Sequence, residues 1–272
     1  MVRSGIRSKN FQMALGFELS SVQSRRLPRA LNEGRSQAAM NVSLRPELQV
    51  AINRGRRGSS LMEPSLQKLL EIGGAPFVSK DAEFTVPVLD RFGSIGASLA
   101  DVLRRKDGFF CFESALRVFP SVTTESSWSI GEWNSHDLWK ADYRGLADVV
   151  LCFAEELFGR QFVIAGGEVG IFEVETGEVE IVACSLEEWA SKILLDYNQM
   201  TGYGIAHKWQ HKYGPLHARH RLMAKTPFVL GGDYSVSNLA STESHQMMKE
   251  LGNLAYQIHD LPEGTRVELK VL

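Results

Sequence analysis

Cysteine is scarce in this sequence, and its three cysteines follow no metal-binding or redox pattern. Cys111, Cys152 and Cys184 are odd in number, form no CxxC pair and stand among apolar residues. Secreted domains held together by disulfides carry an even number of closely spaced cysteines. The sequence therefore predicts no disulfide framework, and we expect three buried thiols in a reducing cytoplasm.

Long apolar runs are also missing. The sequence has no stretch of about 18 apolar residues, the length that a membrane-spanning helix needs. The basic N-terminus lacks the continuous apolar core of about 7–15 residues that a secretory signal peptide needs. We therefore expect a cytoplasmic protein without a membrane partner.

Common catalytic motifs are absent as well. There is no GxSxG nucleophile turn and no phosphate-binding GxxxxGK[ST] or GxGxxG loop. Gly166-Gly167 and Gly231-Gly232 open no such frame and are predicted to be turns. Glu155-Glu156 and Glu187-Glu188 are adjacent rather than facing, so neither pair resembles a general acid and base set across a substrate. We expect no enzyme, no catalytic residue and no cofactor.

A group of histidines is the one feature that suggests a metal. Four of the seven histidines lie close together: His207, His211, His217 and His220. His207 and His211 are spaced to share a helix face, and a third histidine could complete a zinc site. The pair lacks the internal glutamate of a zinc protease motif, and nearby Lys and Arg disfavour a dication. We favour surface histidines and no metal, with a metal-dependent hydrolase using these four histidines as the alternative.

Charge divides the chain into two parts. Residues 1–60 hold 11 Lys and Arg against 3 Asp and Glu, which leaves 19 basic and 29 acidic residues for 61–272. The first part shows no sustained helix or strand period, so we predict a basic, poorly ordered extension over 1–60. Residues 61–272 are predicted to form a single acidic domain. Such a domain attracts a basic partner and repels nucleic acid.

The fold signal is strongest between residues 153 and 195. Three apolar runs, 162–164, 169–174 and 179–183, are separated by Gly166-Gly167 and by the turn 175–178, which predicts an antiparallel meander. Ser185 stands where a helix N-cap is expected, and the helix that follows has one apolar face. The fold class is therefore α+β, with a central and mainly antiparallel sheet flanked by helices.

Weaker patterns predict the other elements. Helices are expected over 66–72, 94–106, 201–213 and 244–258, and strands over 149–153, 228–230 and 266–271. The aromatic segment 109–119 is predicted to be core. Residues 84–89 are interrupted by Pro87 and favour an edge strand or an extended linker.

Two sets of residues are candidates for contact with a partner. Trp128, Trp133 and Trp139 stand among serines and asparagine, and exposed tryptophans are common anchors of protein interfaces, although core tryptophans are more common. Glu178 and Glu180 would share one face of a strand and present charge to a basic partner. An ordinary solvated strand face is the simpler interpretation of the two glutamates.

The order of several pieces from about Leu99 to Leu272 resembles the SUKH superfamily, bacterial immunity proteins related to the yeast regulator of cell-wall synthesis. The pieces are FFCFESALRVFPS (109–121), LWKADY (138–143), LCFAEELFGRQFVI (151–164), ETGEVE with SLEEW (175–189), KTPFVLGGDYSVSNL (225–239) and DLPEGTRVEL (260–269). The resemblance implies a non-catalytic cytoplasmic immunity protein that neutralises a cognate toxin, often a nuclease. An intracellular scaffold or regulator is a further alternative.

Overall fold

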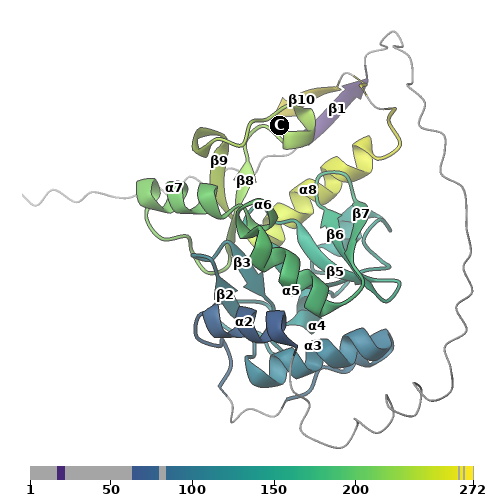
Figure 1. Ribbon diagram of the computed structural model, residues 1–272. Coiled ribbons are helices and arrows are strands. Elements are labelled where there is room, and N and C mark those ends of the chain that lie inside the picture. Colours follow the sequence, from purple (N-terminus) through teal and green to yellow (C-terminus); the bar gives the residue numbers. More distant parts are fainter. Residues whose placement is uncertain (1–16, 22–62, 80–83, 263, 266, 272) are drawn as a thin grey trace, which may run out of the picture.

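The computed structural model describes residues 17–21, 63–79, 84–262, 264–265 and 267–271. Its centre is a six-stranded antiparallel sheet in which neighbouring strands follow one another along the chain (Figure 1). The strands are β2 (Phe109–Cys111), β3 (Leu116–Val118), β4 (Leu151–Glu156), β5 (Gln161–Ala165), β6 (Glu168–Glu173) and β7 (Glu178–Ala183). With helices on both faces of the sheet, the architecture is α+β, as the sequence predicts.

The meander β5-β6-β7 forms where the sequence predicts it, because glycine occupies the positions that need a left-handed backbone. Gly166 and Gly167 join β5 to β6 with φ of 59° and 89°, and Gly177 precedes β7 with φ of 75°. A residue with a Cβ adopts such angles only with strain. Strands β5 and β6 are buried along most of their length, whereas β7 is exposed over its first four residues.

Three helices cover one face of the sheet: α2 (Pro64–Ile72), α3 (Gly93–Arg105) and α5 (Leu186–Leu195). The helix α5 begins where the sequence predicts, because the Ser185 side chain accepts a hydrogen bond from the Glu188 amide at 3.1 Å. Its Trp189 ring packs edge-on against Phe153 of β4 and Phe162 of β5, with ring centroids 5.0 and 5.4 Å apart. Burial of one such side chain contributes about 1.5–3 kcal/mol.

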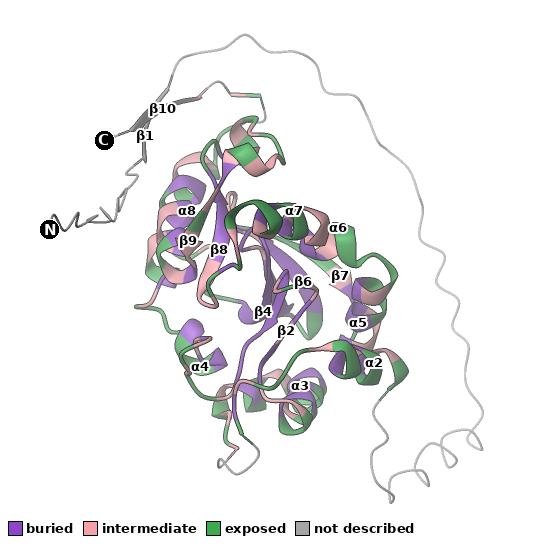
Figure 2. Ribbon diagram, turned by 90° about the vertical axis from the view of Figure 1, so that its left-hand side faces the viewer, coloured by how far each residue is buried: buried purple, intermediate pink, exposed green. Residues whose placement is uncertain are grey.

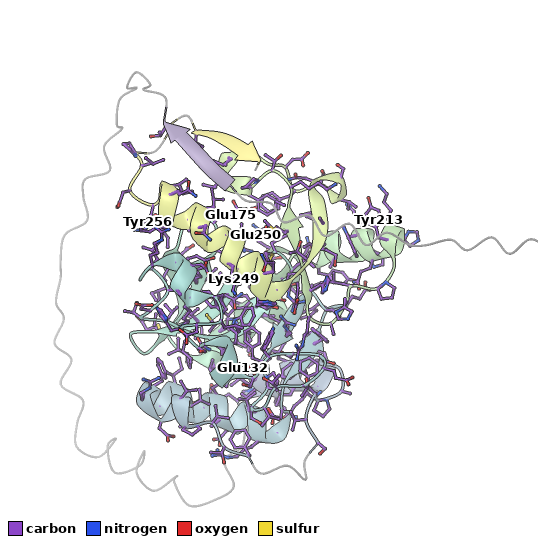
Figure 3. The ribbon with its side chains drawn as sticks, turned by 180° about the vertical axis from the view of Figure 1, so that it is seen from behind. Glu132, Glu175, Tyr213, Lys249, Glu250 and Tyr256 are labelled. Carbon is purple, nitrogen blue, oxygen red and sulfur yellow. The ribbon has the colours of Figure 1, made fainter. Side chains whose placement is uncertain are left out.

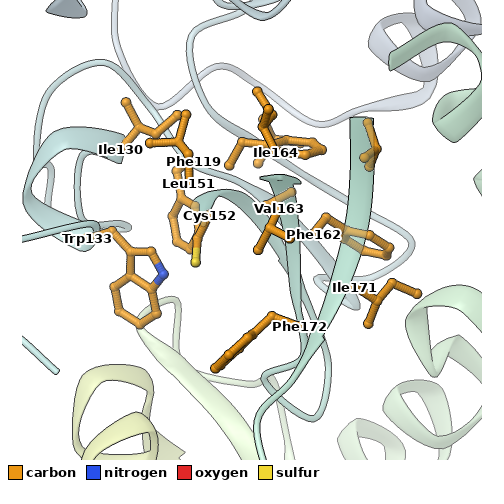
Figure 4. Close-up of a cluster of buried hydrophobic side chains, with 14 of the residues drawn as sticks. Phe119, Ile130, Trp133, Leu151, Cys152, Phe162, Val163, Ile164, Ile171 and Phe172 are labelled. Atoms are coloured by element: carbon orange, nitrogen blue, oxygen red, sulfur yellow. The ribbon is translucent and has the colours of Figure 1, made fainter. Parts of the chain in front are cut away.

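The opposite face is covered by α4 (Ile130–Trp133), the 3-10 turn η2 (Lys140–Tyr143) and α8 (Ser244–Ile258). Trp139 contacts Trp133, Tyr143 and Phe172, with ring centroids 5.8, 5.4 and 6.3 Å away. Figure 4 shows Trp133 and Phe172 on one side of the strands and Phe162 and Ile171 on the other. Figure 2 shows buried residues concentrated in the central strands, and Figure 3 shows α8 lying across the molecule with Lys249, Glu250 and Tyr256 along it.

The remaining elements surround this core. They are β1 (Phe17–Ser21), η1 (Pro87–Phe92), α6 (Tyr197–Thr201), α7 (Tyr203–Tyr213), β8 (His220–Ala224), η3 (Phe228–Leu230), η4 (Val236–Asn238), β9 (Leu239–Glu243) and β10 (Val267–Val271). Strands β8 and β9 form an antiparallel pair, and β1 pairs with β10. Within the described residues, no helix has both the length and the apolar character needed to cross a membrane.

Several sequence-based predictions need correction. Residues 84–89 form no strand: from Pro87 the chain turns into η1. Phe228–Leu230 is a 3-10 turn rather than a strand. Cys184 is exposed, whereas the other two thiols are buried. Residues 17–21 form a strand inside the segment predicted to lack one, and the rest of the predicted extension, 1–16 and 22–60, lies outside the described residues.

Candidate partner-binding edge of the sheet

Strand β7 forms an edge of the six-stranded sheet and is open on its outer side. It pairs with β6 along one side, and no strand pairs with its other side within the described part of the chain. Val179 and Ile181 are 36% and 46% exposed, and Glu178 and Glu180 are exposed as well. A long open strand of this kind offers unpaired backbone groups to another chain.

The side chains of β7 alternate in character between the two faces of the sheet. Val179 lies opposite Phe172, and Ile181 lies opposite Gly170, so both stand on the face covered by α8 and η2. Glu178 and Glu180 stand on the opposite face. Neither glutamate forms an ion pair in the described part of the chain. Two free carboxylates and two apolar side chains therefore share one short open strand.

The C-terminal end of β7 is closed by α5. Lys192 donates a hydrogen bond to the Val182 carbonyl, and the Glu188 carboxylate accepts one from the Cys184 amide at 2.8 Å. Glu188 and Lys192 also pair with each other at 2.9 Å. The open part of the edge is thus limited to Glu178–Ile181.

A groove adjoins the N-terminal end of β7. Its volume is about 540 Å³, and its lining mixes apolar and polar residues. They come from the β6-β7 turn, the start of β7, η3, the end of α8 and the chain after it: Thr176, Glu178, Val229, Leu230, Ile258, His259, Leu261, Pro262, Gly264, Thr265 and Val267. The Glu175 carboxylate accepts hydrogen bonds from the Phe228 and Val229 amides at 3.0 and 2.7 Å. Glu175 therefore holds η3 in place as one wall of the groove.

The three candidate tryptophans do not form an exposed surface. Trp133 and Trp139 are completely buried, so the prediction that they contact a partner is wrong. They fill the space between the sheet and its helices, and the Trp133 indole donates to Gln161 Oε1 at 2.8 Å. Trp128 is half-buried, with the Arg219 guanidinium 4.5 Å from its ring centroid.

The four candidate histidines do not converge on a common point. In the described residues no group of three or more His, Cys, Asp or Glu side chains could hold a metal ion. His217 and His220 lie together with ring centroids 4.8 Å apart, and His220 also lies 2.9 Å from the Ser241 hydroxyl. His211 is exposed. The spacing of His207 and His211 is that of a helix, but within the described residues no third ligand completes a metal site with the pair.

His207 instead supports a strained turn between β2 and β3. Phe112, Glu113 and Ser114 all have a left-handed backbone, with φ of 53°, 51° and 68°. Such a conformation costs about 1 kcal/mol for each residue with a side chain. The Glu113 carboxylate lies 2.9 Å from His207 Nδ1, and Gln210 donates to the Glu113 carbonyl at 2.8 Å. These contacts from α7 offset the strain.

A buried charge cluster escaped sequence reasoning. Glu155 of β4 forms ion pairs with Arg117 of β3 and with Arg221 of β8, and all three side chains are completely buried. Arg117 also donates to the Ala218 carbonyl at 2.8 Å and to the Ser244 hydroxyl at 2.7 Å. Burial lowers the pKa of Arg117 to about 9, partly offset by the attraction of Glu155.

This cluster fastens β8 and α8 to the sheet rather than acting on a substrate. Nothing in a completely buried trio is open to a reactant, and its polar atoms are directed at carbonyls and at the start of α8. The sequence carries one signal for it: charged residues inside otherwise apolar strands. That signal does not reveal which charges meet.

Comparisons with known proteins give no family. No protein-family model matches the sequence, and no curated protein matches it. The chain is similar to a solved structure, that of Atu4351 from Agrobacterium tumefaciens, with a TM-score of 0.47 and 13% identity. The match covers 69% of this chain and 88% of that one. A likeness at this level assigns no function.

Proposed function

We propose that this chain is a non-catalytic immunity protein that binds and neutralises a cognate toxin with a basic surface in the cytoplasm. The observation that carries the proposal is the open acidic edge, where Glu178 and Glu180 are exposed and make no ion pair with any described residue, beside exposed Val179 and Ile181. The order of sequence pieces that resembles the SUKH superfamily supports the same function.

Electrostatics favours a basic partner. Residues 61–272 carry ten more acidic than basic residues, and the described carboxylates at the open edge are not neutralised by neighbouring cations. Opposite potentials speed the encounter of two proteins and fix their orientation, an effect that salt screens over about 8–10 Å. Nuclease toxins, which bind phosphate, carry the matching charge.

Co-expression tests this function. The gene adjacent to the one for this chain is expressed in a bacterial host with and without this protein, and growth is measured. We expect growth to be rescued and the two proteins to co-purify, with an affinity that falls as salt rises. A toxin that stays lethal at full expression of this protein would refute the proposal.

Charge variants make the test specific to the open edge. The double variant Glu178→Lys, Glu180→Lys is compared with Glu125→Lys, which changes an exposed carboxylate in the loop before α4. We expect the double variant to weaken the complex at least about tenfold, through slower association and faster dissociation. The Glu125 variant should bind as the unchanged protein does.

A further inference from the structure

We infer that the open edge of β7 binds its partner by strand addition: a basic, extended segment of the partner pairs with Glu178–Ile181 and places an apolar side chain in the adjoining groove. This inference rests on the proposed function and states how the partner is held. The occupant is thus a peptide segment with Lys or Arg at alternate positions and a large apolar residue at one end.

The backbone of β7 is open on its outer side, in contrast to the backbone at the other edge of the sheet. The opposite edge of the sheet is closed, since the Gly74 amide donates to the Phe110 carbonyl and the Phe77 amide to the Gly108 carbonyl, both at 2.8 Å. Among the described residues, β7 is closed only at its C-terminal end, through Lys192 and Glu188. Backbone groups along an open strand are the usual template for strand addition, in which main-chain hydrogen bonds supply the affinity.

The alternation of charge selects the occupant. In any antiparallel pairing of two copies of β7, each glutamate would lie opposite a glutamate or opposite an apolar side chain. Both arrangements are unfavourable, because like charges directly opposite destabilise a pair and an acid opposite valine gains no contact. A segment with Lys or Arg at every second position places a cation opposite Glu178 and Glu180 while its other side chains meet Val179 and Ile181.

The groove supplies an anchor at one end of the strand. Glu178 belongs both to β7 and to the groove lining, so a segment that pairs with the strand runs directly into the groove. Its volume of about 540 Å³ is in the range of small-ligand sites and holds a Leu, Phe or Met side chain against Val229, Leu230 and Ile258. Anchors of this kind add specificity to a strand held by its backbone.

Synthetic peptides and hydrogen exchange test the inference on the full chain. The probe is an eight-residue peptide that alternates Lys and Val and ends with Leu, so that in antiparallel pairing with β7 its last residue reaches the groove. The control is the same peptide N-methylated at alternate residues. N-methylation leaves the charge unchanged and removes the main-chain donors on one side. We expect the first peptide to bind and to slow amide exchange in 178–181, and the second to bind at least about tenfold more weakly.

Two variants of the full chain test whether the protection depends on the charge of the open edge. Glu178→Lys with Glu180→Lys should abolish the added protection, and Glu125→Lys should leave it unchanged. Equal binding of both peptides, protection elsewhere in the chain, or no binding at about 1 mM peptide would overturn the inference.

The free protein tests the other occupants. If amides 178–181 are protected from exchange without peptide, and the protection does not depend on protein concentration, another segment of this chain occupies the edge. If the protection rises with protein concentration, a second copy occupies it. Either result overturns the inference. If the co-expressed toxin is neutralised but exchange in 178–181 does not change in that complex, the inference fails while the proposed function stands.

Discussion

The two edge strands of the six-stranded sheet differ in how far other segments of the chain hydrogen-bond to their backbone. At β2 the edge strand is three residues long, and the segment after α2 closes it through the Gly74 and Phe77 amides. The Phe77 ring also packs edge-on against Phe110, with ring centroids 4.8 Å apart. At β7 the edge strand is six residues long, and among the described residues the hydrogen bonds from α5 close one end of it.

Within the described residues, the fold closes the edge at β2 along its length and the edge at β7 only at one end. An open strand is a hazard that proteins manage with charge, bulges or cover. Strand β7 has two glutamates and a register shift opposite Val169-Gly170, which guard it against its own copies without covering it.

The largest effect is expected at the closed edge, from Gly108→Val. Gly108 has φ of 65°, and a Cβ there would lie 2.6 Å from Pro120 Cβ and 2.7 Å from the Phe77 ring. Strain and overpacking together should lower the free energy of unfolding by about 3–5 kcal/mol. The matched control is Gly166→Val, where φ is 59° and no atom lies within 4 Å of the new Cβ. That control should cost about 1–2 kcal/mol, and equal losses in urea unfolding would contradict the packing argument.

The second prediction concerns the interior, at Glu156 of β4. Burial raises the pKa of this carboxyl from 4.5 to about 7, although Arg160 opposes the shift. Because the folded state holds this proton more tightly, the contribution of Glu156 to stability is present below pH 4.5 and lost as pH rises through 7.

Unfolding measured between pH 5 and pH 8 tests this effect. The unchanged protein should lose stability between pH 5 and pH 8, and in Glu156→Gln that loss should be smaller by about 2 kcal/mol. The control Glu125→Gln should keep the slope of the unchanged protein. An unchanged slope in Glu156→Gln would show that the carboxyl is already ionised at low pH.

The third prediction compares two lysines, one at each edge. Lys106 donates to the Leu70 and Gly73 carbonyls at the end of α2, whereas Lys192 is 45% exposed and donates to the Val182 carbonyl of β7. Lys106→Met should cost about 1–3 kcal/mol, because two carbonyls lose a charged donor. Lys192→Met should cost less than about 1 kcal/mol. The reverse order in chemical denaturation would mean that β7, not β2, is the more firmly held edge.

The smallest effect is expected at the open edge. Glu178 lies opposite Glu173 in the register, so Glu178→Lys replaces two facing acids with an opposite pair. With Glu180→Lys added, the free energy of unfolding should change by less than about 0.5 kcal/mol. The same double variant is expected to weaken partner binding at least about tenfold. A large loss of stability would mean that the two glutamates are structural.

The meander could be predicted from the sequence because its signals are local. Glycines at 166, 167 and 177 and the cap at Ser185 act on their immediate neighbours, and each lies where the structure needs it. The helices over 94–106 and 244–258 were predictable for the same reason, since the helical spacing of their apolar residues lies within one segment.

The rest depends on contacts between distant residues. Phe228–Leu230 has the composition of a strand, but Glu175, more than fifty positions earlier, binds its amides and sets a 3-10 turn. The buried pairs of Glu155 with Arg117 and Arg221 likewise join three separate strands. Trp133 and Trp139 stand among polar residues, of which Ser135, His136 and Asp137 are exposed, so local composition was a poor guide to the burial of the two indoles. The exposure of Glu178 and Glu180 was predicted from the alternation along one strand. The groove beside them could not be predicted, because three distant segments form it.

The sequential order of the sheet has a consequence for synthesis on the ribosome. Strands β2 to β7 lie next to one another in the order in which they are made, so the sheet can assemble while the chain is still growing. Helix α8, which covers the face with Trp139 and Phe172, begins at Ser244, well after β7 ends at Ala183. Because α4 and η2 are made earlier, α8 is the last part of the cover, and at about 5–20 residues per second that face waits roughly 3–12 s for it. During this interval the nascent chain exposes aromatic surface, and a chaperone that binds such surface has its window there.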